Sequence, residues 1–223
     1  MSTLLAVHGA ARAVGEPYEI IVVDDASTDR TASLAEHAGA RVIRVAHRQI
    51  GATRNSGARE ARGDLLFFVD ADTLVNEAVV RGALAAMRGG AVGGGAMVGF
   101  DLPVPMYALA LLPILVGIFR VARLACGCFL FCTRDAFGAV GGFDETLFGA
   151  EEVVMSRALR RQGRFVILDQ SLTTSGRKLR AYSSWEILRV MGRLALGGFQ
   201  SLRDRRAMDL WYGERREDPK RVA

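Results

Sequence analysis

Two short apolar runs that end in aspartates constrain this chain more than any other feature. They read Glu19-Ile-Ile-Val-Val-Asp24-Asp25 and Leu65-Leu-Phe-Phe-Val-Asp70-Ala-Asp72. Four or five apolar residues rich in β-branched and aromatic types indicate a strand buried on both faces, as in a parallel sheet covered by helices. Ligands of open α/β sheets bind at the carboxyl ends of such strands. The aspartate pairs therefore predict a binding site at one edge of a sheet.

The Asp-x-Asp sequence formed by Asp70 and Asp72 is suited to a divalent cation. Mg²⁺ and Mn²⁺ take oxygen ligands and often share them with substrate phosphates. The expected cofactor is therefore Mg²⁺ or Mn²⁺, and the expected ligand is phosphorylated. The alternative is that both residues are turn aspartates after a strand.

Apolar and polar residues alternate along the chain in the pattern of an α/β domain. Helices are expected near residues 3–14, 30–38, 50–62 and 77–88, and strands near 19–23, 41–45, 65–69, 127–133 and 165–168. Ser2 or Thr3 would cap the first helix, and Asn76 would cap the fourth. The glycine-rich stretch 89–95 leads into an irregular strand that ends near Phe100. These elements predict a mostly parallel sheet flanked by helices.

The distribution of charge divides the chain into two parts. The 223 residues suffice for one domain with a substantial core, and 12 Lys or Arg against 6 Asp or Glu lie between Arg177 and the C-terminus. We therefore expect an α/β domain over 1–176 and a basic helical extension over 177–223 that packs on it. Such an extension suits phosphorylated substrates or an anionic membrane surface, and equally a solvated helical face. Nucleic acid is not expected, since no nucleic-acid-binding signature occurs.

The run from Pro103 to Phe119 is apolar for 17 residues, which raises the question of a membrane span. A span needs about 20 apolar residues, and prolines interrupt this run. We favour an interfacial or acceptor-covering helix, with a core helix as the alternative. Three cysteines between 126 and 132 give no disulfide framework, suit a reducing cytoplasm and are expected to be buried. We expect a cytoplasmic protein without a signal peptide, with a peripheral position at the inner face of the cell membrane as a hypothesis.

Five motifs follow one another between about residues 19 and 170. They are Val22-Val-Asp-Asp-Ala-Ser-Thr-Asp-Arg-Thr31, Gly51-Ala-Thr-Arg-Asn-Ser-Gly57 with Ala61-Arg-Gly-Asp64, Phe68-Val-Asp-Ala-Asp-Thr73, Val140-Gly-Gly-Phe-Asp-Glu145 and Gly149-Ala-Glu-Glu152. In this order and spacing they resemble the motifs of family 2 glycosyltransferases, which have the GT-A fold. The resemblance implies a metal-dependent, inverting transfer of a sugar from a UDP- or GDP-linked donor to a hydroxyl acceptor. A lipid-linked acceptor is a hypothesis that rests on the apolar segment 103–119 and the basic tail.

The resemblance also implies roles for the residues on the donor side. Asp24 and Asp25 would lie beside the base and ribose, and Asp29 would cap the next helix. Arg54 and Asn55 would face the donor, where a guanidinium suits diphosphate recognition. The alternative for Arg54 is a surface arginine in a salt bridge.

Further residues have implied roles in binding the metal and the leaving group. Asp72 would bind the metal directly, and Asp70 would reach the ribose or the metal. The cation would stabilise the departing nucleoside diphosphate. Some relatives place a metal-binding histidine after the last strand, where this chain has Arg177 and Lys178. These two cations would hold the diphosphate instead.

Glu151 and Glu152 are the candidates for the catalytic base that takes the acceptor proton. The family usually presents Glu-Asp at this place, with the aspartate as base. Glu152 occupies the aspartate position, so we expect it to be the base, with Glu151 as the alternate. Acidic residues are also favoured at a helix N-terminus by the helix dipole, which is compatible with catalysis.

The chain also departs from the family pattern at its first element. The family usually opens with a strand that contributes to the nucleotide pocket, whereas here the first element resembles the helix that follows it. Two further hypotheses therefore stay open: a non-catalytic nucleotide-binding relative that lacks the first strand, and a sugar-nucleotide nucleotidyltransferase. The latter usually needs a glycine-rich phosphate loop with a basic residue near the N-terminus, which is not found.

Overall fold

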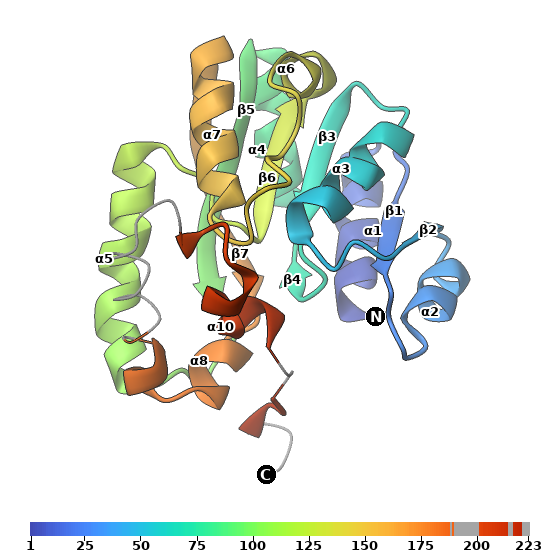
Figure 1. The fold of residues 1–223 in the computed structure, drawn as a ribbon. Coiled ribbons are helices and arrows are strands. Elements are labelled where there is room, and N and C mark those ends of the chain that lie inside the picture. The colour runs from blue at the N-terminus through green and yellow to red at the C-terminus, as the bar shows by residue number, and fades with distance from the viewer. Residues whose placement is uncertain (188, 190–200, 214–215, 220–223) are drawn as a thin grey trace.

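The computed structural model in Figure 1 describes residues 1–187, 189, 201–213 and 216–219. Its strands form two sheets. The smaller sheet pairs β1 (Ile21–Asp25) with β2 (Arg41–Val45) in parallel. The larger sheet has the order β3-β6-β5-β7-β4, with bounds Leu65–Val69 for β3, Phe129–Thr133 for β6, Ala91–Phe100 for β5, Arg164–Thr174 for β7 and Thr73–Leu74 for β4. The two aspartate motifs therefore end strands of different sheets.

The α/β class predicted from the sequence is confirmed, but the sheet is mixed rather than mostly parallel. In the larger sheet β5 and β7 are parallel, whereas β3 with β6, β5 with β6 and β4 with β7 are antiparallel. The difference arises because a buried apolar strand has the same composition in either orientation. Chain direction is set by the connections, which the apolar pattern does not encode.

Helices cover both faces of the larger sheet (Figure 1). The structure has α1 (Ser2–Val14), α2 (Thr31–His37), α3 (Ile50–Glu60), α4 (Glu77–Arg88), α5 (Met106–Ala122), α6 (Arg134–Ala139), α7 (Glu151–Gln162) and α8 (Arg177–Ala181), then the 3₁₀ turn η1 (Arg205–Ala207) and α10 (Asp209–Tyr212). On one face α3, α6 and α7 contribute Ala58, Ala136, Met155 and Leu159 to the core. On the other face α4 contributes Val79, Ala83 and Met87, which pack with Phe129 and Phe131.

The helix starts show which capping predictions hold. Asn76 accepts from the backbone N–H of Val79 and begins α4, as the sequence predicts. Asp29 does not occupy the N-cap of α2, which is Arg30 without a side-chain cap, but it accepts from the N–H of Thr31, the first residue of the helix. The expected cap of α1 is wrong: Met1 is the N-cap, and the Thr3 hydroxyl donates to the carbonyl of Ala71 instead. Thr3 thereby ties α1 to the loop between Asp70 and Asp72.

Two strand predictions change in position or length. β1 begins at Ile21 rather than 19, so Asp24 and Asp25 are its last two residues and do not follow it. β7 has 11 residues rather than four, because it continues from Asp169 to Thr174 along β5. Its second half is polar, so no apolar run marks it in the sequence.

The described part of the segment 177–223 contacts the α/β domain at several points. Arg180 pairs with Asp101 after β5 and with Asp218, and its side chain is 7% exposed. Met208 is fully buried, and the Tyr212 hydroxyl accepts from the N–H of Ile50 at the start of α3. The segment therefore lies close to the elements that carry the aspartate and glutamate motifs.

Candidate active site

The Asp70-Ala71-Asp72 loop is held in place by its own backbone. Asp70 follows β3 directly, and its N–H donates to the carbonyl of Cys128 at 3.1 Å. The N–H of Thr73 donates to the Asp70 carbonyl at 3.0 Å, after which β4 pairs with the end of β7. Because both ends of the loop are hydrogen-bonded into the sheet, the two carboxylates are presented from a fixed backbone.

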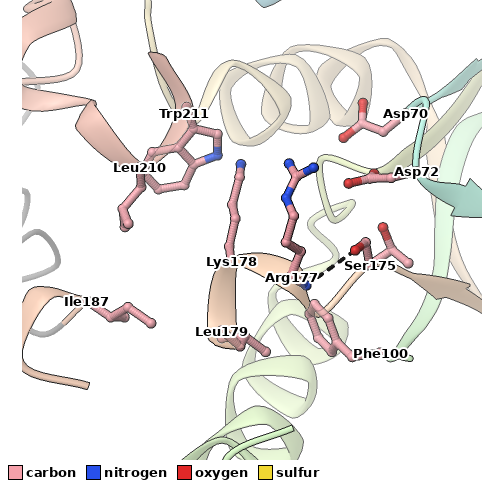
Figure 2. Close-up of a pocket in the computed structure, with 11 residues that line it drawn as sticks. Asp70, Asp72, Phe100, Ser175, Arg177, Lys178, Leu179, Ile187, Leu210 and Trp211 are labelled. Carbon is pink, nitrogen blue, oxygen red and sulfur yellow. Dashed lines mark hydrogen bonds between the residues drawn. The ribbon is translucent and has the colours of Figure 1, made fainter. Parts of the chain in front are cut away.

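The loop borders a pocket that also receives residues from the C-terminal segment. The pocket has a volume of about 280 Å³ and is lined by Asp70, Asp72, Phe100, Thr174, Ser175, Arg177, Lys178, Leu179, Ile187, Leu210 and Trp211. Figure 2 shows Arg177 and Lys178 extending from α8 into it, with Arg177 pointing toward the two aspartates. Its shape thus brings two carboxylates and two cations to one cavity.

Charge and burial act against each other in this pocket. Burial and the neighbouring charge of Asp70 raise the pKa of Asp72, while Lys178 and Arg177 oppose the rise. Burial lowers the pKa of Lys178, although Asp72 and Asp70 oppose that shift. The Lys178 ammonium also lies 5.1 Å from the centre of the Trp211 ring, within cation–π range. A bound cation would offset the like charges of the two aspartates. A bound diphosphate would offset the desolvation of the lysine ammonium.

Arg54 lies beneath the loop and joins it to α7. Its guanidinium donates to Asp70 at 2.8 Å, to Glu151 at 3.1 Å and to the carbonyl of Gly127 at 2.6 Å. It also lies 5.3 Å from the Phe143 ring centre, and its side chain is 12% exposed. Burial alone would lower the Arg54 pKa, but the charges of Asp70 and Glu151 hold it above its ordinary value. The surface-arginine alternative therefore does not hold.

Glu151 and Glu152 begin α7, at the point where the sequence places the base. Glu151 is buried against Arg54. Glu152 faces Gly127: a Cβ at that glycine would lie 3.3 Å from the carboxyl carbon of Glu152. Burial and then the charge of Glu151 raise the pKa of Glu152 to about 7. A carboxylate with such a pKa is suited to take a proton near neutral pH.

Asp24 and Asp25 lie outside this pocket. Asp24 is buried and accepts from the N–H of Ser27 at 3.2 Å. Asp25 accepts from the N–H of Arg48 at 2.8 Å and of Gln49 at 3.1 Å, and from the Thr53 hydroxyl at 2.9 Å. Burial would raise the Asp25 pKa, but these hydrogen bonds outweigh it and lower the pKa. In this structure Asp25 fixes the start of α3, and its contact with a nucleotide stays a prediction.

The side chain of Asn55 is also occupied by hydrogen bonds within the protein. Its amide donates to the carbonyl of Phe143 and to Glu145, and its oxygen accepts from the N–H of Phe143. The buried side chain therefore holds the loop that leads to α7. A donor contact by Asn55 would have to replace these bonds, so this role also stays a prediction.

Asp70 and Asp72 suit a metal ion whose other ligands are phosphates and waters, rather than one coordinated by the protein alone. Among the described residues no group of three or more His, Cys, Asp or Glu side chains could hold a metal ion. Two carboxylates are nevertheless what Mg²⁺ uses when phosphates and waters complete its coordination. Burial and then the charge of Asp70 raise the pKa of Asp72, and a bound cation would oppose both effects.

The comparisons with known proteins follow this geometry. The family model described as glycosyl transferase family 2 matches residues 3–123, which is more than half of the chain. The chain belongs to glycosyl transferase family 2. The comparison with curated proteins gave no match.

Solved structures share the family 2 fold at low sequence identity. TarS 1–349 from S. aureus has a TM-score of 0.59 at 17% identity, covering 86% of this chain and 61% of that one. The mannosyltransferase PcManGT from Pyrobaculum calidifontis, in complex with GDP-Man and Mn2+, has a TM-score of 0.60 at 18% identity, covering 87% and 58%. The chain thus spans less than two thirds of the length of either neighbour.

A third structure, glucosyl-3-phosphoglycerate synthase from Mycobacterium tuberculosis, has a TM-score of 0.56 at 17% identity, covering 87% of this chain and 72% of that one. The family model confirms the predicted family, and the likeness to these glycosyltransferase structures confirms the predicted fold of the GT-A type. The roles of single residues are not decided by a shared fold and stay predictions.

Residues of this site that the sequence does not reveal include Trp211, Phe143 and Gly127. Trp211 lies 33 positions after Lys178, and no spacing rule connects the two. Phe143 belongs to a matched motif, but its contact with Arg54 depends on the loop that Asn55 holds. Gly127 lies between two cysteines, and no sequence pattern indicates that its lack of a side chain leaves room for Glu152.

Proposed function

We propose that this chain is a metal-dependent, inverting glycosyltransferase that moves a hexosyl group from a nucleotide-diphosphate donor to a hydroxyl acceptor. One observation carries the proposal: Asp70 and Asp72 share a pocket with Arg177 and Lys178 (Figure 2). Carboxylates that suit a divalent metal and cations that suit phosphate oxygens are the two halves of a diphosphate–metal site.

The donor occupies the pocket with its diphosphate between these halves. Arg177 and Lys178 would bind the phosphate oxygens, and Asp72 and Asp70 would hold Mg²⁺ or Mn²⁺. When bound, the metal neutralises charge on the departing diphosphate. Two structural neighbours, PcManGT and the glucosyl-3-phosphoglycerate synthase, are in complex with Mn2+ and with GDP-Man or uridine-diphosphate, which supports the choice of metal and of donor class. Asp24 and Asp25 are proposed to lie toward the base and ribose.

Glu152 is the proposed base. Its carboxylate takes the proton of the acceptor hydroxyl as the acceptor oxygen bonds to the anomeric carbon. The bond from that carbon to the diphosphate breaks, and the nucleoside diphosphate leaves with the electron pair. Arg54 positions this machinery, because it contacts Asp70 on the donor side and Glu151 beside the base. Attack opposite the leaving group inverts the anomeric centre.

A lipid-linked acceptor and a position at the inner face of the cell membrane belong to the same proposal. Leu179 lines the pocket, and its carbonyl accepts from the Tyr107 hydroxyl at the start of α5 at 3.4 Å. The apolar helix α5 therefore begins beside the pocket, where an acceptor with an apolar tail would approach.

Calorimetric titration of UDP and of GDP, each with and without Mn²⁺, tests the proposal. We expect one nucleotide to bind in a Mn²⁺-dependent manner, and Asp72→Asn to weaken that binding at least about tenfold because a metal ligand is lost. Asp64→Asn is the matched control, since Asp64 is an exposed aspartate that directly precedes β3, the strand that leads to Asp70 and Asp72. Metal-independent binding, or equal loss in both variants, would contradict the proposal.

A further inference from the structure

Helix α5 lies at the outer side of the molecule (Figure 1), and its exposed side chains form an apolar surface. Seven of its large apolar side chains are 44% to 86% exposed: Met106, Leu109, Leu111, Ile114, Leu115, Ile118 and Val121. Ala108 is the only buried residue of this helix, all of whose residues the structure describes. Exposed apolar side chains are common singly, but a contiguous set of this kind marks an interaction surface.

The width of this surface argues for a lipid partner. At about 100° per residue, the exposed side chains spread over roughly 240° of the helix circumference. The less exposed arc contains Ala108, Leu112, Val116 and Phe119. A packed partner helix covers a stripe of only about 100°, so one helix of a second copy would leave much of the apolar surface in water. A bilayer surface adapts to a wider arc.

Charge favours an anionic bilayer. No acidic residue occurs between Asp101 and Asp135, while Arg120 and Arg123 stand at the C-terminal end of α5. Arg160 of α7 adds a third guanidinium there, donating to the carbonyl of Ala122 at 2.6 Å. Arg120 also pairs with Asp169 at 2.5 Å, and that aspartate is largely exposed. Binding at a membrane interface increases with the buried apolar area and with the attraction to anionic lipids, and these arginines supply the second contribution.

The length of α5 argues against a span. Its 17 residues measure about 26 Å at 1.5 Å per residue, against about 30 Å for the hydrocarbon core. Within the part of the chain that the structure describes, no helix is both long and apolar enough to cross a membrane. The helix would therefore lie along the surface rather than across the bilayer.

We propose that the exposed face of α5 docks on an anionic bilayer, with its apolar side chains at the boundary of headgroups and acyl chains and Arg120 and Arg123 at the level of the phosphates. The proposal rests on the membrane position proposed above, for which it names the docking face and the lipid chemistry, and it does not rest on the transfer reaction. A protein without transferase activity could still bind vesicles in this way.

Co-sedimentation with vesicles tests it, using phosphatidylcholine alone and phosphatidylcholine mixed with phosphatidylglycerol. The wild type is expected to bind the anionic vesicles more strongly. The double variant Ile114→Gln, Ile118→Gln should reduce binding at least about tenfold, since two apolar side chains leave the membrane. Leu5→Gln with Leu34→Gln, two exposed leucines on α1 and α2, is the matched control and should change nothing. Far-ultraviolet circular dichroism checks that each variant is folded.

The charge component has its own test. Arg120→Gln with Arg123→Gln should weaken binding to the anionic vesicles by about fivefold for each charge and leave the weaker binding to neutral vesicles unchanged. Absence of wild-type binding to both vesicle types, or an equal loss in the α1–α2 control, overturns the proposal. A dimer in sedimentation velocity that Ile114→Gln with Ile118→Gln dissociates would assign the face to a second copy and overturn it as well.

Discussion

Arg54 lies on helix α3 and donates a hydrogen bond to the carboxylate of Asp70 at 2.8 Å, which links α3 to the loop after β3. The same guanidinium reaches Glu151 at the start of α7. The donor side of the site and the neighbour of the proposed base are thereby connected through one nearly buried side chain. A change at Arg54 is expected to act on both.

Arg54→Gln should lower the free energy of unfolding by about 3–5 kcal/mol, because it leaves the buried carboxylate of Glu151 without its partner. Urea unfolding at pH 7 measures the effect. Arg59→Gln on the same helix is the control: this arginine is 61% exposed and 3.7 Å from Glu145, so its loss should cost less than about 1 kcal/mol. Equal losses in the two variants would show that Arg54 is not the buried link described here.

The pH dependence of the transfer rate distinguishes Glu152 from Glu151 as the base. The base must be ionised, so a pKa near 7 predicts a rate that rises between about pH 6 and 8, well above the ordinary glutamate value of 4.5. Glu152→Gln should reduce the rate by about 10²–10⁴-fold. Glu151→Gln should keep activity and move the rise to lower pH, because it removes a like charge. Loss of activity only in Glu151→Gln would reverse the assignment.

Asp25→Asn should destabilise the fold by about 1–3 kcal/mol at pH 7, since an amide nitrogen would face the N–H of Gln49 or of Arg48. The folded-state pKa of Asp25 lies below its ordinary 3.8, so its contribution is present above that pH and is lost as pH falls through the lower value. The gap between wild type and variant in urea unfolding should therefore narrow below pH 4. A gap that stays constant from pH 7 to pH 3 would argue against these hydrogen bonds.

Gly94→Ala tests the close approach of strands β5, β6 and β7. A Cβ there would lie 2.5 Å from Phe131 and closer still to the carbonyl oxygen of Val166. Both neighbours belong to the sheet, so the variant should lose at least about 1–3 kcal/mol by overpacking. Gly99→Ala in the same strand has its nearest atom at 3.7 Å and should be neutral or slightly stabilising. Thermal melts of both variants make the comparison, and similar melting temperatures would contradict it.

The local part of the fold follows from the sequence because short-range chemistry determines it. The run before Asp70 forms β3 with the predicted bounds, and Asn76 begins α4. The polar half of β7 and the antiparallel pairing of β6 do not follow, because both depend on neighbours distant in sequence. Tertiary pairing, not residue pattern, selects them.

In the candidate site too, some features follow from the sequence and others depend on tertiary contacts. Asp70, Asp72, Arg177 and Lys178 share a pocket, as expected of residues that serve one ligand. Arg54 was predicted to face a diphosphate, whereas its described partners are Asp70, Glu151 and Gly127. A sequence motif identifies a residue that matters but not the atoms it contacts, because helix α3 and the loop held by Asn55 decide where the guanidinium points.

The most direct test of the central claim is a crystal structure with UDP or GDP, whichever binds, and Mn²⁺, using the anomalous signal of manganese. The account predicts a manganese peak at Asp72 and Asp70, with the diphosphate between the metal and the side chains of Arg177 and Lys178. A nucleotide bound elsewhere, or manganese away from both aspartates, would contradict it.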